Sequence, residues 1–180
     1  MGYTHYWHQE NGDVPSDLWE KFVSDCKKIL ALIQKSGVAL CYEYDEPRSK
    51  VHCSKDMVRF NGPNELGHET FILSPNEIDF QFCKTAQKPY DLAVCSCLIL
   101  ALHHFGDYIS VSSDGDPADW TDAVRLVFQT FGYGDFPFTD EDVRERFVED
   151  YVPQALADLE AARKEIGLDR LSEVEIEKPI

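Results

Sequence analysis

Residues that could bind or react are concentrated in four short polar stretches. They are YTHYWH at 3–8, RFNGPNELGHET at 59–70, FCKTAQKPYD at 82–91 and SDGDPADW at 113–120. In the third stretch, Lys84, Thr85 and Lys88 stand just before an apolar run that suits a buried helix. Backbone N–H groups at a helix start favour anions, and lysine adds positive charge. These residues predict contacts to a phosphate or carboxylate. The alternative is a solvated loop, because the glycines of a phosphate loop are absent.

The same stretch contains Cys83, which is a candidate nucleophile. A nucleophilic cysteine needs thiolate character and a base within hydrogen-bond reach. The neighbouring lysines could lower its pKa, and His68 could act as the base, with Glu69 or Asp91 orienting it. Nothing in the spacing brings these residues together. The alternative is a buried, inert thiol.

Further candidates for ligand binding come from the other three stretches. They are Tyr6, Trp7, Arg59, His68, Asp114 and Asp116. The aromatic residues would stack on a ring, the basic ones would contact an anionic group, and the aspartates would accept from hydroxyl or amino groups. Core packing would also explain the aromatic residues, and Asp116 or Asp119 could cap a helix that carries Trp120.

No pattern in the sequence matches a known arrangement of metal ligands. His103 and His104 are adjacent, so on a helix they diverge, and Cys95 and Cys97 do not share a helical face. The zinc spacings CxxC and HExxH are absent. The sequence therefore predicts neither a metal site nor a cofactor.

These stretches need a scaffold of strands and helices. Strands are predicted at 3–9, 38–44, 51–53, 57–62, 68–74, 78–84 and 109–111, and helices at 16–36, 89–106, 119–132 and 139–167. In the strand at 78–84, Ile78, Phe80 and Phe82 alternate with Asp79, Gln81 and Cys83, which predicts one covered apolar face. The order of elements favours an α+β fold, with an antiparallel or mixed sheet and helices packed mainly on one face. We expect a single domain over 1–167 and an acidic tail over 168–180.

The chain has 180 residues and a formal net charge of −16. This acidity disfavours binding to a nucleic-acid backbone, but residues 48–88 carry a slight positive excess and could form a local anion site. About half of the negative excess lies in 135–180, which could bind a basic host protein. The longest apolar run is too short to cross a bilayer, no secretory signal is evident, and the six cysteines form no CxxC pair. We expect a cytoplasmic protein with free, buried thiols.

Several motifs together resemble a known group of proteins. They are the opening MGYTHYW, the central GHETF, then FCKTAQKPYD, and SDGD with a nearby DW. The chain is similar over residues 1–132 to an uncharacterised family of short phage, prophage and bacterial proteins. This resemblance implies a cytoplasmic role in an infected bacterial host and carries no mechanism with it.

Three functions are compatible with these observations. The first is a binding protein with a polar pocket for a small phosphorylated or nucleotide-like ligand, which in a phage setting would counteract host defence. The second is a hydrolase or transferase that uses Cys83 and His68. The third is an acidic protein that blocks a host protein through residues 135–180. We favour the first.

Overall fold

The computed structural model describes residues 3–77 and 79–138, and this part of the chain has an α+β fold. Its strands are β1 (Thr4–Gln9), β2 (His52–Cys53), β3 (Val58–Phe60), β4 (Phe71–Leu73), β5 (Phe80–Lys84) and β6 (Ile109–Ser113). Its helices are α1 (Ser16–Lys35), α2 (Asp91–Phe105) and α3 (Thr121–Phe131), with short 3-10 turns at Asn64–Leu66, Gly106–Tyr108 and Pro117–Trp120. The predicted fold class is therefore confirmed.

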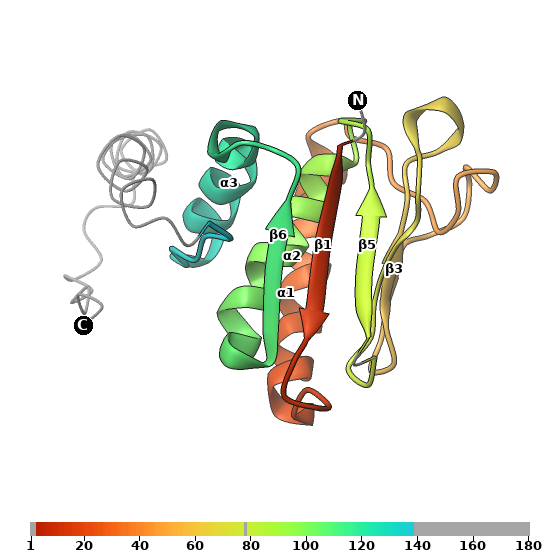
Figure 1. Ribbon diagram of the computed structural model, residues 1–180. Helices are drawn as coiled ribbons and strands as arrows, with labels where there is room; N and C mark the ends of the chain where they lie inside the picture. Colours follow the sequence, from red (N-terminus) through yellow and green to blue (C-terminus); the bar gives the residue numbers. More distant parts are fainter. Residues whose placement is uncertain (1–2, 78, 139–180) are drawn as a thin grey trace, which may run out of the picture.

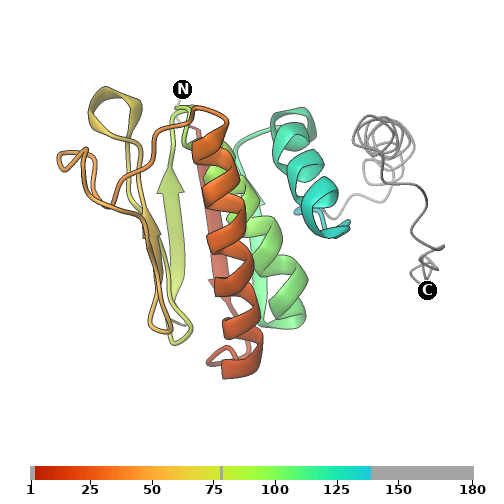
Figure 2. The same ribbon diagram turned by 180° about the vertical axis from the view of Figure 1, so that it is seen from behind.

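The strands form two small antiparallel sheets rather than one. The first has the order β5-β1-β6, and the second has the order β2-β3-β4. In the first sheet, Tyr6 of β1 lies opposite Phe82 of β5 and Ser112 of β6. Figure 1 shows this sheet in front with α1 and α2 behind it, and Figure 2 shows the two helices from the other side. One face of the sheet is thus covered by helices.

Helix α2 forms the centre of the core. Its sequence is apolar on all sides, and residues 93–101 are all buried. A helix of this kind is stable only when other elements surround it. It packs against α1, α3 and β6, and aromatic rings from α1 contact its last residue, Phe105. Helix α1 is amphipathic, and its apolar side includes Trp19 and Phe22.

One predicted strand is absent. The segment 38–44 is not a strand, because its β-type pairing with the rest of the described chain is limited to a single bridge between Cys41 and Asn61. Strand-favouring residues need a neighbouring ladder, and this segment instead turns, with the backbone N–H of Tyr42 bonded to the hydroxyl of Ser49. Helix α1 begins at Ser16, as the predicted helix at 16–36 does, and Pro15 precedes it without a side-chain cap.

Strand β5 has the predicted alternation but the opposite orientation. Phe80 and Phe82 are 60% and 54% exposed, whereas Cys83 is completely buried. The thiol of Cys83 faces inward against the backbone carbonyl of Glu69 and the hydroxyl of Tyr90. The two phenylalanines consequently lie on the face of the sheet that α1 and α2 leave uncovered.

The remaining structural predictions concern cysteines, membrane helices and the C-terminal segment. All six cysteines are free, as predicted, and all but the partly exposed Cys53 are buried. No helix within the described residues has the length and apolar character needed to cross a membrane. The predicted helix at 139–167 and the tail at 168–180 lie outside the described residues.

Candidate functional site

Three of the four polar stretches meet around the buried side chain of His5. His5 is fully buried on the inner face of β1. Its Nδ1 atom is 2.9 Å from the hydroxyl oxygen of Ser113, and its Nε2 atom is 2.8 Å from a carboxylate oxygen of Asp91. The sheet brings β1 and β6 together, and α2 begins at Asp91 behind them. Residues far apart in the sequence therefore form one hydrogen-bonded group.

Two further side chains complete what we call the His5 cluster, which consists of His5, Thr85, Asp91, Cys95 and Ser113. The buried hydroxyl of Thr85 donates to Asp91. The sulfur of Cys95, one helical turn beyond Asp91, lies 3.5 Å from His5 Nε2 and 3.7 Å from the second carboxylate oxygen of Asp91. Burial, followed by the nearby Asp91 carboxylate, raises the pKa of Cys95 well above its usual range.

The surroundings of the His5 cluster are tightly packed. The rings of Tyr3 and Trp120 meet the His5 ring edge-on, with centroids 5.0 and 4.9 Å away. Gly115 lies so close to Tyr3 that an added Cβ would come within 2.6 Å of the ring, so the SDGD stretch needs glycine at this position. Its backbone N–H donates to the Ser113 hydroxyl at 2.9 Å. The contacts hold His5 and Ser113 in fixed positions.

A pocket of about 270 Å³, the Tyr3 pocket, opens beside this cluster. Its lining includes Tyr3, Lys88, Asp91, Cys95, Asp119 and Asp122. The Tyr3 hydroxyl is buried and has no hydrogen-bond partner among the described residues. Three carboxylates against one lysine make the pocket acidic. The carboxylates around Lys88 therefore disfavour the anion contact that the sequence predicted for this lysine.

The turn before α2 has an unusual backbone. Ala86 and Gln87 have positive φ angles of 50° and 54°, and the Lys88 N–H bonds to the Thr85 carbonyl at 3.0 Å. Two adjacent non-glycine residues rarely adopt this conformation, because the Cβ atom crowds the backbone. The turn is held by two hydrogen bonds from 85–86 to the Tyr3 carbonyl. It places Thr85 inside the His5 cluster and Lys88 at the pocket.

The outer face of the same sheet has a different character. By strand alternation, Tyr6 and His8 of β1 share this face with Phe80 and Phe82 of β5. We call these four residues the aromatic face. Tyr6 stacks on Phe80, with ring centroids 5.7 Å apart, and its hydroxyl is 3.2 Å from a carboxylate oxygen of Asp114.

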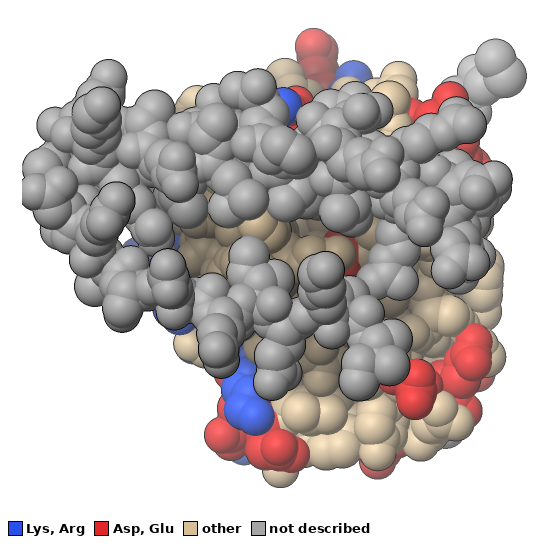
Figure 3. All heavy atoms as spheres, turned by 90° about the vertical axis from the view of Figure 1, so that its left-hand side faces the viewer, with Lys and Arg blue, Asp and Glu red and all other residues tan. Residues whose placement is uncertain are grey.

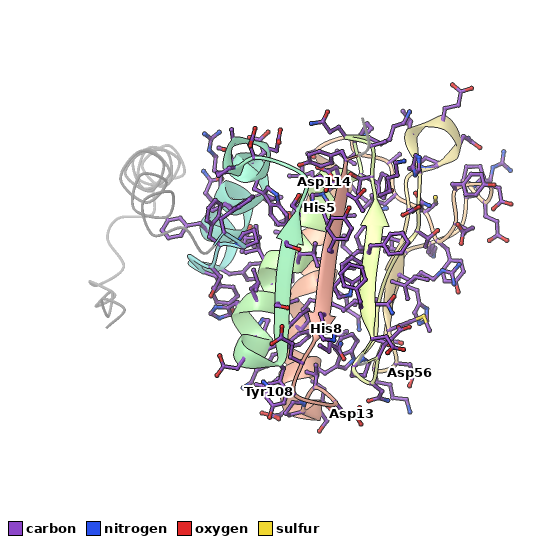
Figure 4. The ribbon with its side chains drawn as sticks, viewed as in Figure 1. His5, His8, Asp13, Asp56, Tyr108 and Asp114 are labelled. Atoms are coloured by element: carbon purple, nitrogen blue, oxygen red, sulfur yellow. The ribbon has the colours of Figure 1, made fainter. Side chains whose placement is uncertain are left out.

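Polar groups surround the aromatic face. Lys84 follows Phe82 two residues further along β5, so it lies on the same face. Ser110 and Ser112 of β6 are exposed opposite His8 and Tyr6. Figure 4 shows Asp114 near the same end of the sheet as His5, with His8 toward the other end. The sheet thus brings together Tyr6, Lys84 and Asp114 among the predicted ligand-binding residues.

The predicted Cys83 and His68 do not form a catalytic pair in the described contacts. Burial raises the pKa of Cys83 to about 12, and its sulfur contacts Glu69 and Tyr90. His68 is held through its backbone by the side chain of Asn61. A buried thiol with a raised pKa lacks the thiolate character of a nucleophile.

Other predicted binding residues serve the structure. Arg59 belongs to β3 in the second sheet and pairs with Glu43. Its guanidinium carbon lies 4.3 Å from the centre of the Tyr42 ring. Trp7 is buried and packs on Phe71. Asp116 forms a capping box with Asp119 at the 3-10 turn that carries Trp120, which confirms the alternative of a helix cap.

A second polar cluster joins α1, the end of α2 and the segment that follows α3. Asp25 accepts hydrogen bonds from His104, Tyr133 and Lys28 at 2.9, 3.1 and 3.2 Å. Burial alone would raise the pKa of Asp25, but these bonds outweigh it and lower the pKa. Burial lowers the pKa of His104. The adjoining cavity of about 500 Å³ is lined mainly by exposed α1 residues.

The sequence contained an unused signal for the His5 cluster. Asp91 and Cys95 are four residues apart and so share one side of α2, and His5 alternates with Tyr3 and Trp7 on the inner side of β1. Residue spacing alone predicts both of these shared faces. It does not predict that β1 and α2 lie against each other.

Comparison with protein-family models, curated proteins and solved structures finds no match in any of the three searches. In the side view of Figure 3, acidic side chains form several groups on the described surface, with basic side chains among them.

Proposed function

We propose that the protein binds a small nucleotide-like ligand, an aromatic ring joined to a phosphate, on the outer face of the β5-β1-β6 sheet. The observation that carries this proposal is the exposure of Phe80 and Phe82, at 60% and 54%, beside the ring of Tyr6. Adjacent exposed phenylalanines on a strand are unfavourable for solubility and are unusual without a partner. Flat aromatic rings on an open sheet face are typical of sites that stack on nucleobases.

Polar neighbours match the rest of such a ligand. Lys84 lies about 7 Å along β5 from Phe82, a distance comparable to that between the base and the phosphate of a mononucleotide. Asp114 and the exposed hydroxyls of Ser110 and Ser112 can accept hydrogen bonds from sugar hydroxyls or base amino groups. The aromatic face can therefore meet each part of the ligand with a suitable group.

The charge of the chain favours a small ligand over a polynucleotide. A net charge of −16 repels an extended phosphate backbone, whereas a single phosphate needs only one local cation. Together with the resemblance to phage proteins, this suggests that the chain sequesters a nucleotide signal of the host's defence in the bacterial cytoplasm.

The test is a ligand panel measured by thermal shift and calorimetry on the full chain. The panel contains nucleoside monophosphates, cyclic mononucleotides and dinucleotides, with unphosphorylated nucleosides and ribose phosphate as partial ligands. The variants are Phe82→Ala and Lys84→Ala. The matched control is Leu32→Ala, which removes a 39% exposed side chain from α1, away from the sheet.

Phe82→Ala should weaken binding about 5- to 150-fold, because one stacked base contributes about 1–3 kcal/mol. Lys84→Ala should weaken the binding of phosphorylated ligands and leave the binding of nucleosides unchanged. Leu32→Ala should bind as the wild type does. The proposal fails if no panel member binds below about 1 mM. It also fails if Phe82→Ala binds normally.

A further inference from the structure

The His5 cluster has the donor set and spacing of a transition-metal site. His5 Nε2, the Asp91 carboxylate and Cys95 Sγ all lie within 4.8 Å of one another. The nitrogen–sulfur and sulfur–oxygen separations are 3.5 and 3.7 Å. Ligand atoms of a tetrahedral zinc site lie about 3.3–3.7 Å apart, given zinc–ligand bonds of about 2.0–2.3 Å. We propose that His5, Asp91 and Cys95 bind a zinc-type divalent ion.

Only a small adjustment separates the described geometry from a tetrahedral site. Asp91 Oδ1 is 2.8 Å from His5 Nε2, closer than two ligands of one zinc ion would lie. The hydroxyl of Thr85 already holds this oxygen. The other oxygen, Oδ2, faces Cys95 and is the one that would bind the ion. Asp91 and Cys95 belong to one turn of α2, so their spacing is set by the helix.

Neighbouring groups would orient the ligands. Metal-binding histidines usually donate their second ring N–H to a fixed acceptor, which sets the tautomer. Ser113 Oγ lies 2.9 Å from His5 Nδ1, and the Gly115 N–H holds that hydroxyl from its other side. Nδ1–H can therefore donate to Ser113 while Nε2 points to the ion.

The Tyr3 pocket gives the site access and an open position. His5 and Cys95 are 0% and 1% exposed, while Asp91 and Cys95 also line the pocket. Three protein ligands leave a fourth position for water or another ligand, as in exchangeable or catalytic zinc sites. The Tyr3 hydroxyl, buried and without a partner among the described residues, lines the same pocket. Asp119 and Asp122, opposed there only by Lys88, favour entry of a cation.

The donor types select the metal. Sulfur and imidazole nitrogen suit zinc and its neighbours in the transition series, whereas magnesium and calcium require oxygen ligands. The inference goes beyond the proposed function, because the metal ligands face inward and share no residue with the aromatic face. Each can fail without the other.

The experiment uses the full chain, freed of metal and kept reduced without thiol reagents. Zinc affinity is measured by competition with a chromophoric chelator, and Co²⁺ is added as a spectroscopic probe. A tetrahedral Co²⁺ site with one thiolate gives visible ligand-field bands and a sulfur-to-metal charge-transfer band. The variants are Cys95→Ser and Asp91→Asn. The control is Cys97→Ser, a buried cysteine of the same helix that contacts Cys26 instead.

We expect one ion per chain in the wild type and in Cys97→Ser. Zinc affinity should fall at least about 100-fold in both ligand variants, more than the loss typical of outer-shell changes. The charge-transfer band should vanish in Cys95→Ser. Absence of that band in the wild type overturns the proposal, and this result does not depend on any variant folding. A band that survives in Cys95→Ser, or that is lost in Cys97→Ser, would overturn it equally.

Discussion

The side chain of Asn61 should be worth several kilocalories per mole to the fold. It is completely buried and makes four hydrogen bonds. Its amide nitrogen donates to the His68 carbonyl and the Thr70 hydroxyl at 2.9 and 3.0 Å. Its oxygen accepts from the backbone N–H groups of Gly62 and His68 at 2.8 and 3.2 Å. The NGPNELGHET stretch is thus closed into a loop by one residue.

The size of the effect follows from these bonds. At about 0.5–1.5 kcal/mol each, the four bonds amount to about 2–6 kcal/mol in Asn61→Ala. This is a large fraction of the 5–15 kcal/mol that holds a typical domain folded. The melting temperature should fall by at least about 4 °C. Urea unfolding, followed by circular dichroism, measures the change.

His68→Ala is the matched control. Its backbone keeps both bonds to Asn61, so the free energy of unfolding should stay within about 0.5 kcal/mol of the wild type. An Asn61→Ala variant as stable as the wild type would refute the reasoning. So would a His68→Ala variant that loses as much as Asn61→Ala, because the ring and not the loop closure would then carry the stability.

Three further predictions concern strain, pH and thiol chemistry. Gln87→Gly should raise the free energy of unfolding by about 0.5–1 kcal/mol, because glycine accepts the φ of 54° without strain. The control Gln34→Gly, within α1, should lower it by about 1 kcal/mol. If calorimetry shows that both variants shift the stability in the same direction, the prediction is contradicted. Asp25→Asn should destabilise the fold by roughly 1–3 kcal/mol at pH 7. The folded-state pKa of Asp25 is lowered from its ordinary value, so the wild type should be more stable than Asp25→Asn while the carboxylate is ionised. The difference in the free energy of unfolding should shrink as falling pH protonates Asp25, which denaturation experiments at a series of decreasing pH values measure. A difference that grows on acidification would contradict this prediction. Cys83, with a pKa of about 12, should resist alkylation at pH 7 in the folded chain and react in urea, as mass spectrometry would detect; rapid selective labelling of the folded chain would restore the cysteine-nucleophile hypothesis.

Local patterns predicted most of the elements that the structure describes. The run at 89–106 is apolar on all sides, and such a helix has no stable position except inside the core, where α2 lies. The strand predicted at 3–9 corresponds to β1, and the helix predicted at 16–36 corresponds to α1, with Gly37 at a φ of 103° just beyond its cap residue Ser36. These predictions hold because backbone geometry sets the period of each element within a few residues.

The sequence predicted less well which face of a strand meets the core. Alternation divides β5 into two faces but does not state which one meets the core. The apolar count favoured Phe80 and Phe82 as the buried side. The structure buries Cys83 instead, because its small thiol fits beneath the strand against Tyr90 and the Glu69 carbonyl. The exposed phenylalanines, and the ligand proposal built on them, depend on that choice.

The sequence by itself determined most of the described elements, the polar stretches, the free thiols and the acidic charge of this chain. Only the tertiary structure decided that β1, α2 and β6 meet, so that His5 contacts Asp91 and Ser113, which are 86 and 108 residues away. The physical reason is range. Backbone geometry acts between near neighbours, whereas contacts between distant residues follow from burying the helices against one face of the sheet, a free energy that the whole chain shares.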